Sequence, residues 1–355
     1  MAHSIIDIAI IGAGTAGCMA AKQLSEAGLR CCVIEKSRGL GGRCSRRRVP
    51  DIENVDLGAS SFSTYDIDSQ QLIDYTQHWV KLGYLTEWNF KSASFQPSFP
   101  ITEQIELCGM PSMNAFHRHL LGDVTCLKQQ HVHTLQRTDE VWQLLDGADQ
   151  LITEATAVII TAPAEQTYSL VGQYTHFATA ILEASQSSLP QYVCAISLEH
   201  PLETSVDVFQ GSHPVFSKAI RANSKPNQKG TKVHQKHDIW VLHSTHEWAQ
   251  QQHNQDAEIV ADKMHHLFCE HFNLSMQPES SKVLTSHYWR LAGHRITTAN
   301  SSLVNDNASQ QPFLWDEGLR LGCCADWLSG GGIIGALNSS QNLSDHIAST
   351  LTQEV

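Results

Sequence analysis

The start of the chain alternates between apolar and mixed segments in the order strand, helix, strand. Residues 5–11 are rich in β-branched side chains and stop at Gly12, which predicts a buried strand. Residues 18–27 are rich in alanine and predict a helix that stops at Gly28. Residues 29–35 are again mostly apolar. We therefore expect a βαβ unit with a right-handed crossover and a parallel sheet.

Further along the chain the pattern becomes more mixed. A hairpin-like stretch at 124–145 precedes a strand that ends at Thr161. Strands at 193–198 and 239–243 and an amphipathic helix near 256–272 predict a second, mixed domain. The C-terminal part returns to a strand at 319–324, a glycine run and a last helix.

Composition excludes several classes of protein. The 355 residues suit about two domains at roughly 150 residues each. A formal charge of −12 argues against nucleic acid as a partner. No apolar run is long enough to predict a membrane-spanning helix. The ten cysteines lack C-x-x-C spacing, and no basic segment precedes the first apolar run, so we expect reduced thiols and a cytoplasmic location.

A glycine motif lies between the first strand and the first helix. Gly12-x-Gly14-x-x-Gly17 is followed by Glu35 at the end of the second strand, which is the spacing of a dinucleotide fingerprint. The glycines permit the turn, the approach of a pyrophosphate and close helix packing, while the helix N-terminus attracts the phosphates. Glu35 is expected to bind the ribose hydroxyls.

Two further segments favour a flavin over a nicotinamide. Residues 36–43 follow the acid and include a Gly-Gly-Arg sequence, and Asp326 precedes the glycine run 330–332. The chain thus resembles glutathione-reductase-like flavoproteins of the amine oxidase type. The resemblance implies that Arg43 backs the pyrophosphate, that Asp326 binds the ribityl chain, and that the last helix points its N-terminus at the flavin pyrimidine edge. Simple helix capping is the alternative explanation of the glycine run.

The resemblance narrows to the bacterial renalase branch through landmarks that occur in the expected order along nearly the whole chain, namely 56–62, 109–114, 221–226, 247–248 and 289–292. It implies an α/β fold, with a discontinuous Rossmann-type FAD-binding domain (1–64, 106–167 and 286–355) and an inserted α+β substrate domain (65–105 and 168–285). Non-covalent FAD is the implied cofactor. The residues expected to bind it are Gly12, Ala13, Gly14, Thr15, Ala16, Gly17, Glu35, Lys36, Gly42, Arg43, Gly58, Ala59, Ser60, Val132, Asp326, Ile333, Ile334 and Ala336.

The activity implied by the resemblance is oxidation of 2- or 6-dihydro isomers of NAD(P) to NAD(P)⁺, with molecular oxygen as acceptor and hydrogen peroxide as product. The chain departs from the family pattern at Ser60 and Ser61, where we expect an amide and an aromatic residue, and at Ile334, where we expect an acid. These departures leave the exact substrate open.

Hydride transfer to flavin N5 needs no protein base, so the protein would chiefly position and desolvate the substrate. Packing is the alternative for every residue we expect to line the substrate side, and a surface salt bridge is the favoured interpretation for Arg290. These candidates are Ser60, Ser61, Trp240, His243, His287, Trp289 and Arg290. No metal is expected, because no second ligand pair accompanies His243-x-x-His246.

Three alternatives stay open. The first is an amine oxidase or desaturase on the same scaffold, the second is a non-catalytic flavin-binding sensor, and the third is a nicotinamide dehydrogenase, which needs no ribityl-binding acid. The sequence does not predict the oligomeric state.

Overall fold

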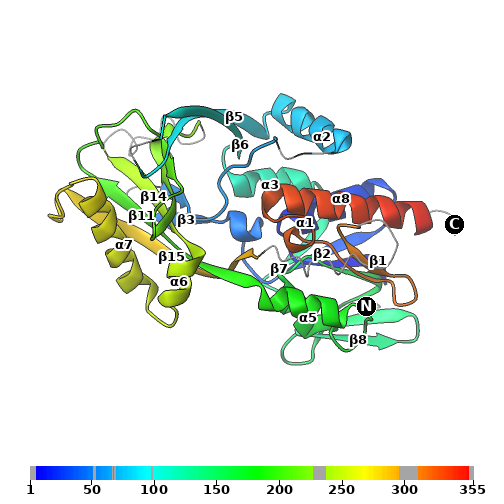
Figure 1. Cartoon of the computed structure of the whole chain (residues 1–355). Helices are drawn as coiled ribbons and strands as arrows, with labels where there is room; N and C mark the ends of the chain where they lie inside the picture. The colour runs from blue at the N-terminus through cyan, green and yellow to red at the C-terminus, as the bar shows by residue number, and fades with distance from the viewer. Residues whose placement is uncertain are drawn as a thin grey trace.

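The structure is a computed structural model of the whole chain. It describes residues 5–50, 53–65, 67, 69–96, 99–226, 237–295 and 311–351. The chain is arranged around two large sheets that lie beside each other (Figure 1).

The first sheet has eight strands and a mostly parallel centre, as the βαβ pattern predicts. Its order is β16 (Leu314–Asp316), β17 (Leu321–Cys323), β10 (Leu151–Ile160), β1 (Ile6–Ile11), β2 (Cys31–Glu35) and β7 (Thr125–Lys128), with the hairpin β8 (Thr134–Thr138) and β9 (Val141–Leu145) attached to β10. β1 pairs in parallel with β2 and β10, and β10 pairs in parallel with β17. The C-terminal strand β17 thus joins the sheet of the N-terminal unit through β10.

Helices cover both faces of this sheet. On one face α1 (Thr15–Glu26) packs against α8 (Gly332–Leu351) and α3 (Met113–Leu121). On the other face α4 (Ala164–Val171) and α5 (Ala178–Gln186) share a core with the β8–β9 hairpin. The adjacent Cys323 and Cys324 lie in opposite cores, as expected for neighbours in a strand.

The second sheet has seven strands and is mostly antiparallel. Its order is β15 (Ser281–His294), β11 (Ser188–Leu198), β14 (Asp238–Ser244), β13 (Phe216–Arg221), β12 (Val208–Gln210), β5 (Leu85–Ala93) and β6 (Thr102–Gly109). The helices α6 (His246–Gln251) and α7 (Ala257–His271) pack on one face, and the ribbon of β3 (Arg46–Val49) and β4 (Glu53–Asp56) packs on the other. The helix α2 (Gln70–Lys81) lies beside β5.

Some expected boundaries fall inside elements. The divisions at 105/106, 167/168 and 285/286 interrupt β6, α4 and β15. The helix α5, which the expected boundaries place in the substrate domain, instead packs on the first sheet, because Ile181 and Ala184 are buried in its core. The first helix begins at Thr15, inside the glycine motif, rather than at Cys18.

All ten cysteines lie in the described segments and carry free thiols. Within the same segments, no helix combines the length and the apolar character that crossing a bilayer requires.

The core between α7 and the second sheet can be tested with two residues of one helix. Phe268 is 0% exposed, whereas Ile259 is 56% exposed. We expect Phe268→Ala to lower the free energy of unfolding by about 3–5 kcal/mol, because it leaves a cavity in a packed core. Ile259→Ala should change it by less than about 0.5 kcal/mol. Urea unfolding of both variants checks this, and equal effects would contradict the described packing.

Candidate functional site

The glycine motif forms the tight turn that the sequence predicts. Gly12 has a φ of 107°, and a Cβ at Gly17 would overlap the carbonyl oxygen of Gly12. A Cβ at Gly14 would meet no atom within 4 Å. Gly14 is also the N-cap of α1, and no side chain caps that helix. The first amides of α1 therefore face open space, where a phosphate could bind them.

Glu35 stabilises this turn from the end of β2. Its carboxylate is buried and accepts hydrogen bonds from the amide of Ala13 at 2.8 Å and from the amide of Ser37 at 2.7 Å. Each carboxylate oxygen has further acceptor capacity, so these bonds do not preclude ribose binding. Binding of the ribose by Glu35 stays a prediction.

The Gly-Gly-Arg segment lies directly against the turn. Gly41 donates its amide to the carbonyl of Ala13 at 2.8 Å, and a Cβ at Gly42 would lie 3.5 Å from the Cα of Gly14. Arg43 then binds the carboxylate of Asp326 at 2.5 Å. The two residues that the resemblance assigns to the pyrophosphate and the ribityl chain thus form one ion pair.

The segment after β4 closes on the same arginine. Ala59 donates its amide to the carbonyl of Arg43 at 2.9 Å, and a Cβ at Gly58 would overlap that carbonyl. Ser60 follows and is buried. Segments near residues 14, 43, 58 and 326 therefore come together although they are far apart in the sequence.

The glycine run opens α8 beside the same segments, because the amide of Gly331 donates to the carbonyl of Asp326 at 2.9 Å. The space bordered by these segments is called the groove below. Gly330, Gly331 and Gly332 all have positive φ, and Cβ atoms there would meet nothing within 4 Å. The side chains of Ile333 and Ala336 are buried in the core beside α1, so only their backbone is available to a ligand. Ile334 is partly buried against the same core.

Two expected cofactor residues lie near the end of β2, Lys36 directly after it and Val132 in the segment between β7 and β8. Lys36 donates to the side chain of Gln166 at 3.2 Å. Val132 is buried in the core on the α4 face, close to where Gln130 donates its amide to the carbonyl of Glu35 at 3.0 Å. Their contacts with a cofactor stay predictions.

A buried histidine supports the turn from α3. His117 is 0% exposed, and its Nδ1 donates to the carbonyl of Met113 at 2.6 Å. Its Nε2 therefore accepts from the hydroxyl of Thr15 at 2.9 Å. Burial lowers the pKa of His117 to about 4, so the ring is neutral near pH 7.

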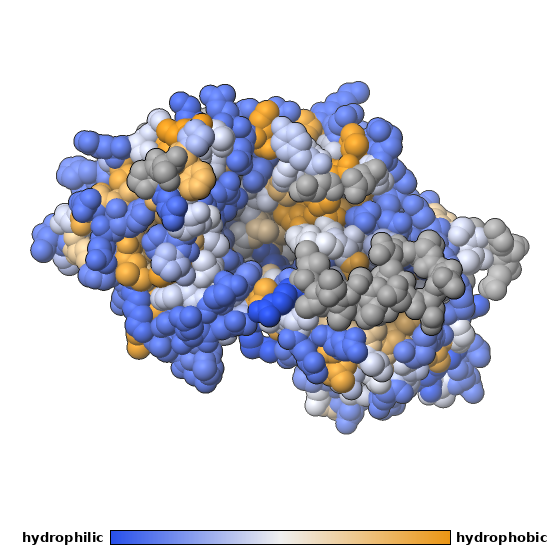
Figure 2. All heavy atoms as spheres, in the orientation of Figure 1, coloured by the Kyte–Doolittle hydropathy of each residue, from blue (hydrophilic) through white to orange (hydrophobic). Residues whose placement is uncertain are grey.

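One face of the second sheet lies toward the Gly58 segment and carries the candidate substrate groups. His243 pairs in register with Lys218, and both side chains point to this face. Ser61 donates to Glu106 at 2.5 Å, and Glu106 lies 3.7 Å from Lys218. Burial and the nearby lysines lower the pKa of His243 to about 3. Figure 2 shows the surface hollowed between the two halves of the molecule.

Not every sequence candidate lies on this face. Trp240 is 0% exposed and packs against Phe268 of α7, so its expected place in the substrate pocket is wrong. The physical reason is the alternation along β14, which places Trp240 in the core beneath α7 and Val241 in the opposite core, so that His243, two positions after Val241, points away from Trp240. Arg290 forms an exposed ion pair with Glu165 at 2.7 Å, the alternative favoured from the sequence.

The aromatic candidates on β15 join the two parts of the chain. Trp289 packs against the core beneath β3 and β4 and donates its indole N–H to the carbonyl of Leu57 at 3.0 Å. His287 lies at 3.1 Å from the exposed Arg47. These contacts account for both side chains as packing and positioning groups.

Sequence reasoning missed Glu106, Lys218, Lys225 and His117. No periodic signal marks Glu106 and Lys218, since burial does not alternate along β6 or β13. Across the described ranges, no cluster of three or more His, Cys, Asp and Glu side chains could hold a metal ion.

Comparison with known proteins supports the fold. A family model described as an NAD(P)-binding Rossmann-like domain matches residues 10–77. A protein from Exiguobacterium sp. 255-15 assigned as a protoporphyrinogen oxidase is 11% identical, with a TM-score of 0.69 over 98% of this chain and 99% of that one. Putrescine oxidase bound to putrescine is 13% identical, with a TM-score of 0.65 over 97% and 99% of the two chains.

Cyclohexylamine oxidase from Brevibacterium oxydans IH-35A is 10% identical, with a TM-score of 0.64 over 98% of this chain and 100% of that one. The chain has the fold of these oxidases. The expected α/β class with a Rossmann-type domain is thereby confirmed.

Gly14 provides a test of the phosphate position. Gly14→Asp should leave the free energy of unfolding of the cofactor-free protein unchanged or slightly raised, because Asp is a favourable N-cap and meets no atom within 4 Å. We expect its affinity for FAD to fall at least about tenfold, since the carboxylate would repel a phosphate. Fluorescence titration with FAD measures this. Ser69→Asp, at the N-cap of α2, is the matched control and should keep full affinity.

The buried His117 predicts a pH dependence of stability. Its folded pKa of about 4 lies below the ordinary 6.5, so the unfolded chain binds more protons between these values. The free energy of unfolding should therefore fall as the pH drops from about 6.5 toward 4.

In His117→Gln this fall should be smaller, whereas the exposed His253→Gln should keep the full pH dependence. Urea unfolding at several pH values gives the comparison. Identical curves for His117→Gln and the unsubstituted protein would contradict the assignment.

Proposed function

We propose that the protein is an FAD-dependent oxidase of the renalase type, which oxidises 2- or 6-dihydro isomers of NAD(P) and passes the electrons to oxygen. The observation that carries this proposal is the convergence of the Gly14 turn, the Arg43–Asp326 pair, the Gly58 segment and the Gly330–332 run on one groove. A nicotinamide cofactor alone would not require the later segments.

The residues fit a dinucleotide with a flavin ring. Cβ atoms at Gly14 and Gly330–332 would enter open space, and the first amides of α1 have no side-chain cap. The α1 N-terminus and Arg43 would hold the pyrophosphate, and Asp326 would accept a bond from the ribityl hydroxyls. FAD, when bound, supplies a ring that accepts a hydride.

The chain's own residues would bind, orient and desolvate the substrate. The Gly58–Ser61 segment forms one side of the space and the His243 face of the second sheet forms the other. His243 is neutral near pH 7, and the carboxylate of Glu106 is paired with the ammonium of Lys218. The face can therefore form hydrogen bonds with a substrate but presents no unpaired carboxylate to it. We assign no base, because the nitrogen lone pair of such substrates supports hydride loss.

An amine oxidase is the second candidate, and the names of the structural neighbours favour it, since putrescine oxidase and cyclohexylamine oxidase have the same fold. The ammonium of Lys225 lies 3.4 Å from the carbonyl of Ser60 and forms no ion pair with a described carboxylate, so it would repel a protonated amine, and this supports the dihydronicotinamide substrate instead.

Anaerobic mixing separates these candidates. The 2-, 4- and 6-dihydro isomers of NAD(P)H and a set of primary amines would each be added to the purified protein, and the oxidised-flavin absorbance would be followed. We expect rapid bleaching by the 2- or 6-isomer alone, with colour and peroxide returning when air is admitted. Bleaching by amines would favour the amine oxidase, and a yellow protein bleached by nothing would favour the sensor.

Asp326 tests the flavin assignment itself. Asp326→Ala should lower FAD affinity at least about tenfold, because it removes a buried charged acceptor and leaves Arg43 without its ion-pair partner. The exposed Glu317→Ala serves as the control and should remain yellow. Full FAD content in Asp326→Ala would overturn the role of Asp326 in flavin binding, whereas an unsubstituted protein that binds NAD(P) and no FAD would support the nicotinamide dehydrogenase.

A further inference from the structure

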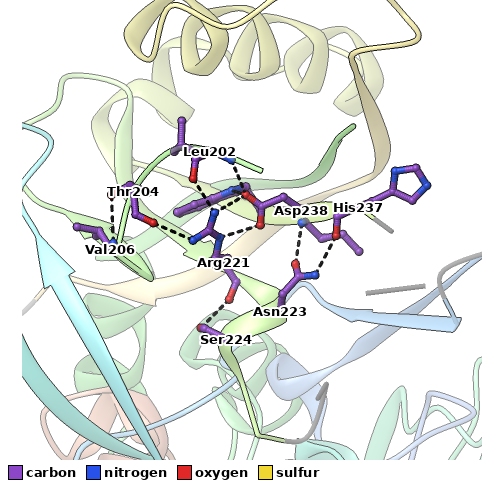
Figure 3. A network of polar contacts seen from close by, with 10 residues as sticks. Leu202, Thr204, Val206, Arg221, Asn223, Ser224, His237 and Asp238 are labelled. Atoms are coloured by element: carbon purple, nitrogen blue, oxygen red, sulfur yellow. Dashed lines mark hydrogen bonds and ion pairs between the residues drawn. The ribbon is translucent and has the colours of Figure 1, made fainter. Parts of the chain in front are cut away.

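The landmark at 221–226 has no role in the function proposed above, yet it forms a dense polar network (Figure 3). Arg221 binds both carboxylate oxygens of Asp238 at 2.7 Å. Its guanidinium also donates to the carbonyls of Leu202 and Thr204 and lies over the ring of Trp240. These hydrogen bonds of Arg221 hold the end of β13 against β14 and the segment before β12.

The next residues fasten the segment to β14. The side-chain amide of Asn223 donates to the carbonyl of His237 at 2.9 Å and accepts from the amide of Ile239 at 2.8 Å. Ser224 donates to the carbonyl of Arg221 at 2.8 Å. Figure 3 shows Asn223 directed at the start of β14 and Arg221 directed at Asp238. Hydrogen bonds thus hold the segment as far as Ser224, and Lys225 follows it directly.

Lys225 extends from this fixed segment to the groove. It is 3% exposed, and its ammonium lies 3.4 Å from the carbonyl of Ser60 and 5.2 Å from the ring centre of Trp88. Ser60 belongs to the segment that closes on Arg43. Within the described residues, no carboxylate forms an ion pair with Lys225.

A small cavity adjoins the ammonium. It is lined by Asp56, Ser60 and Lys225 together with apolar side chains, and it has room for about one water molecule. The oxygens of Asp56 are buried and accept no hydrogen bond from the described residues, although Oδ1 lies 3.2 Å from Nε of Arg46. A bound water would satisfy Asp56 and Lys225 together.

The other charged side chains near Lys225 form ion pairs with each other. Asp56 is paired with Arg46, and Glu106 lies 3.7 Å from Lys218. Burial lowers the pKa of Lys225 while Asp56 and Glu106 raise it, and no described carboxylate forms a direct ion pair with its ammonium. When protonated, this buried ammonium is poorly screened by solvent.

We propose that Lys225 is a positioning residue of the cofactor, whose buried ammonium attracts the negative charge that the flavin ring acquires when it takes up an electron pair. This inference rests on the proposed binding of FAD. The segment 221–226 would then hold the ammonium of Lys225 near the part of the groove that binds the flavin ring. A purely structural lysine would stabilise the fold without changing the chemistry of the flavin.

Sulfite tests this without turnover. Its lone pair would form a bond to flavin N5 while the C4a=N5 π bond opens, and that π pair would leave a negative charge on the ring, so no oxidant or proton donor is needed. Loss of the oxidised-flavin absorbance gives the dissociation constant. For Lys225→Met loaded with FAD, we expect this constant to rise at least about tenfold and the flavin reduction potential to fall.

Lys225→Arg keeps the charge and should retain much of the sulfite affinity. Lys225→Gln keeps a hydrogen-bond donor for the carbonyl of Ser60 without the charge. Its sulfite dissociation constant should rise as it does in Lys225→Met. This variant provides the test if the methionine variant folds poorly. Lys91→Met, an exposed lysine of β5, is the control and should change the constant by less than about twofold.

The outcomes separate this inference from the proposed function. A protein that binds no FAD would overturn the proposed function. FAD-loaded Met and Gln variants with unchanged sulfite affinity and reduction potential would overturn the role of Lys225 alone. An equal loss in Lys91→Met would also overturn it, because the effect would then not depend on the buried position.

Discussion

The close approach of backbone to backbone around the groove is the constraint on which the other features depend. Gly17 must lie against the carbonyl of Gly12, and Gly58 must lie against the carbonyl of Arg43, so neither position has room for a side chain. This packing brings the segments that carry the α1 N-terminus, the Arg43–Asp326 pair and Ser60 together. Without it, each segment could keep its own secondary structure, but the polar groups would not converge.

The sequence predicts the first sheet well because its signals are local. The β-branched run at 6–11, the glycine spacing and the acid at Glu35 all lie within one βαβ unit, and the structure has that unit. The landmark at Asp326 also points correctly to a second segment near the groove. Its pairing with Arg43 spans 283 positions, and no local pattern encodes such a contact.

The second sheet shows why the remaining details could not be predicted. Strand periodicity gives which residues share a face but not which face meets the cofactor, so Trp240 and His243 were both assigned to the pocket although they point to opposite sides. The lysines are a similar case. Lys218 and Lys225 look like ordinary polar positions until the Gly58 segment and β6 are placed against them. The alternation of polar and apolar residues along one strand does not predict which segment of the chain packs against that strand.

The order of strands in the first sheet has a consequence for biosynthesis. The strand β17 pairs with β10 in the centre of the sheet, and Asp326 follows it, so the last part of the chain completes both the sheet and the groove. Contacts of such long sequence separation form late and slowly. A nascent chain would expose the open edge of β10 until β17 leaves the ribosome. The groove would then be complete only after the segment from β17 to Asp326 has been synthesised and has paired with β10.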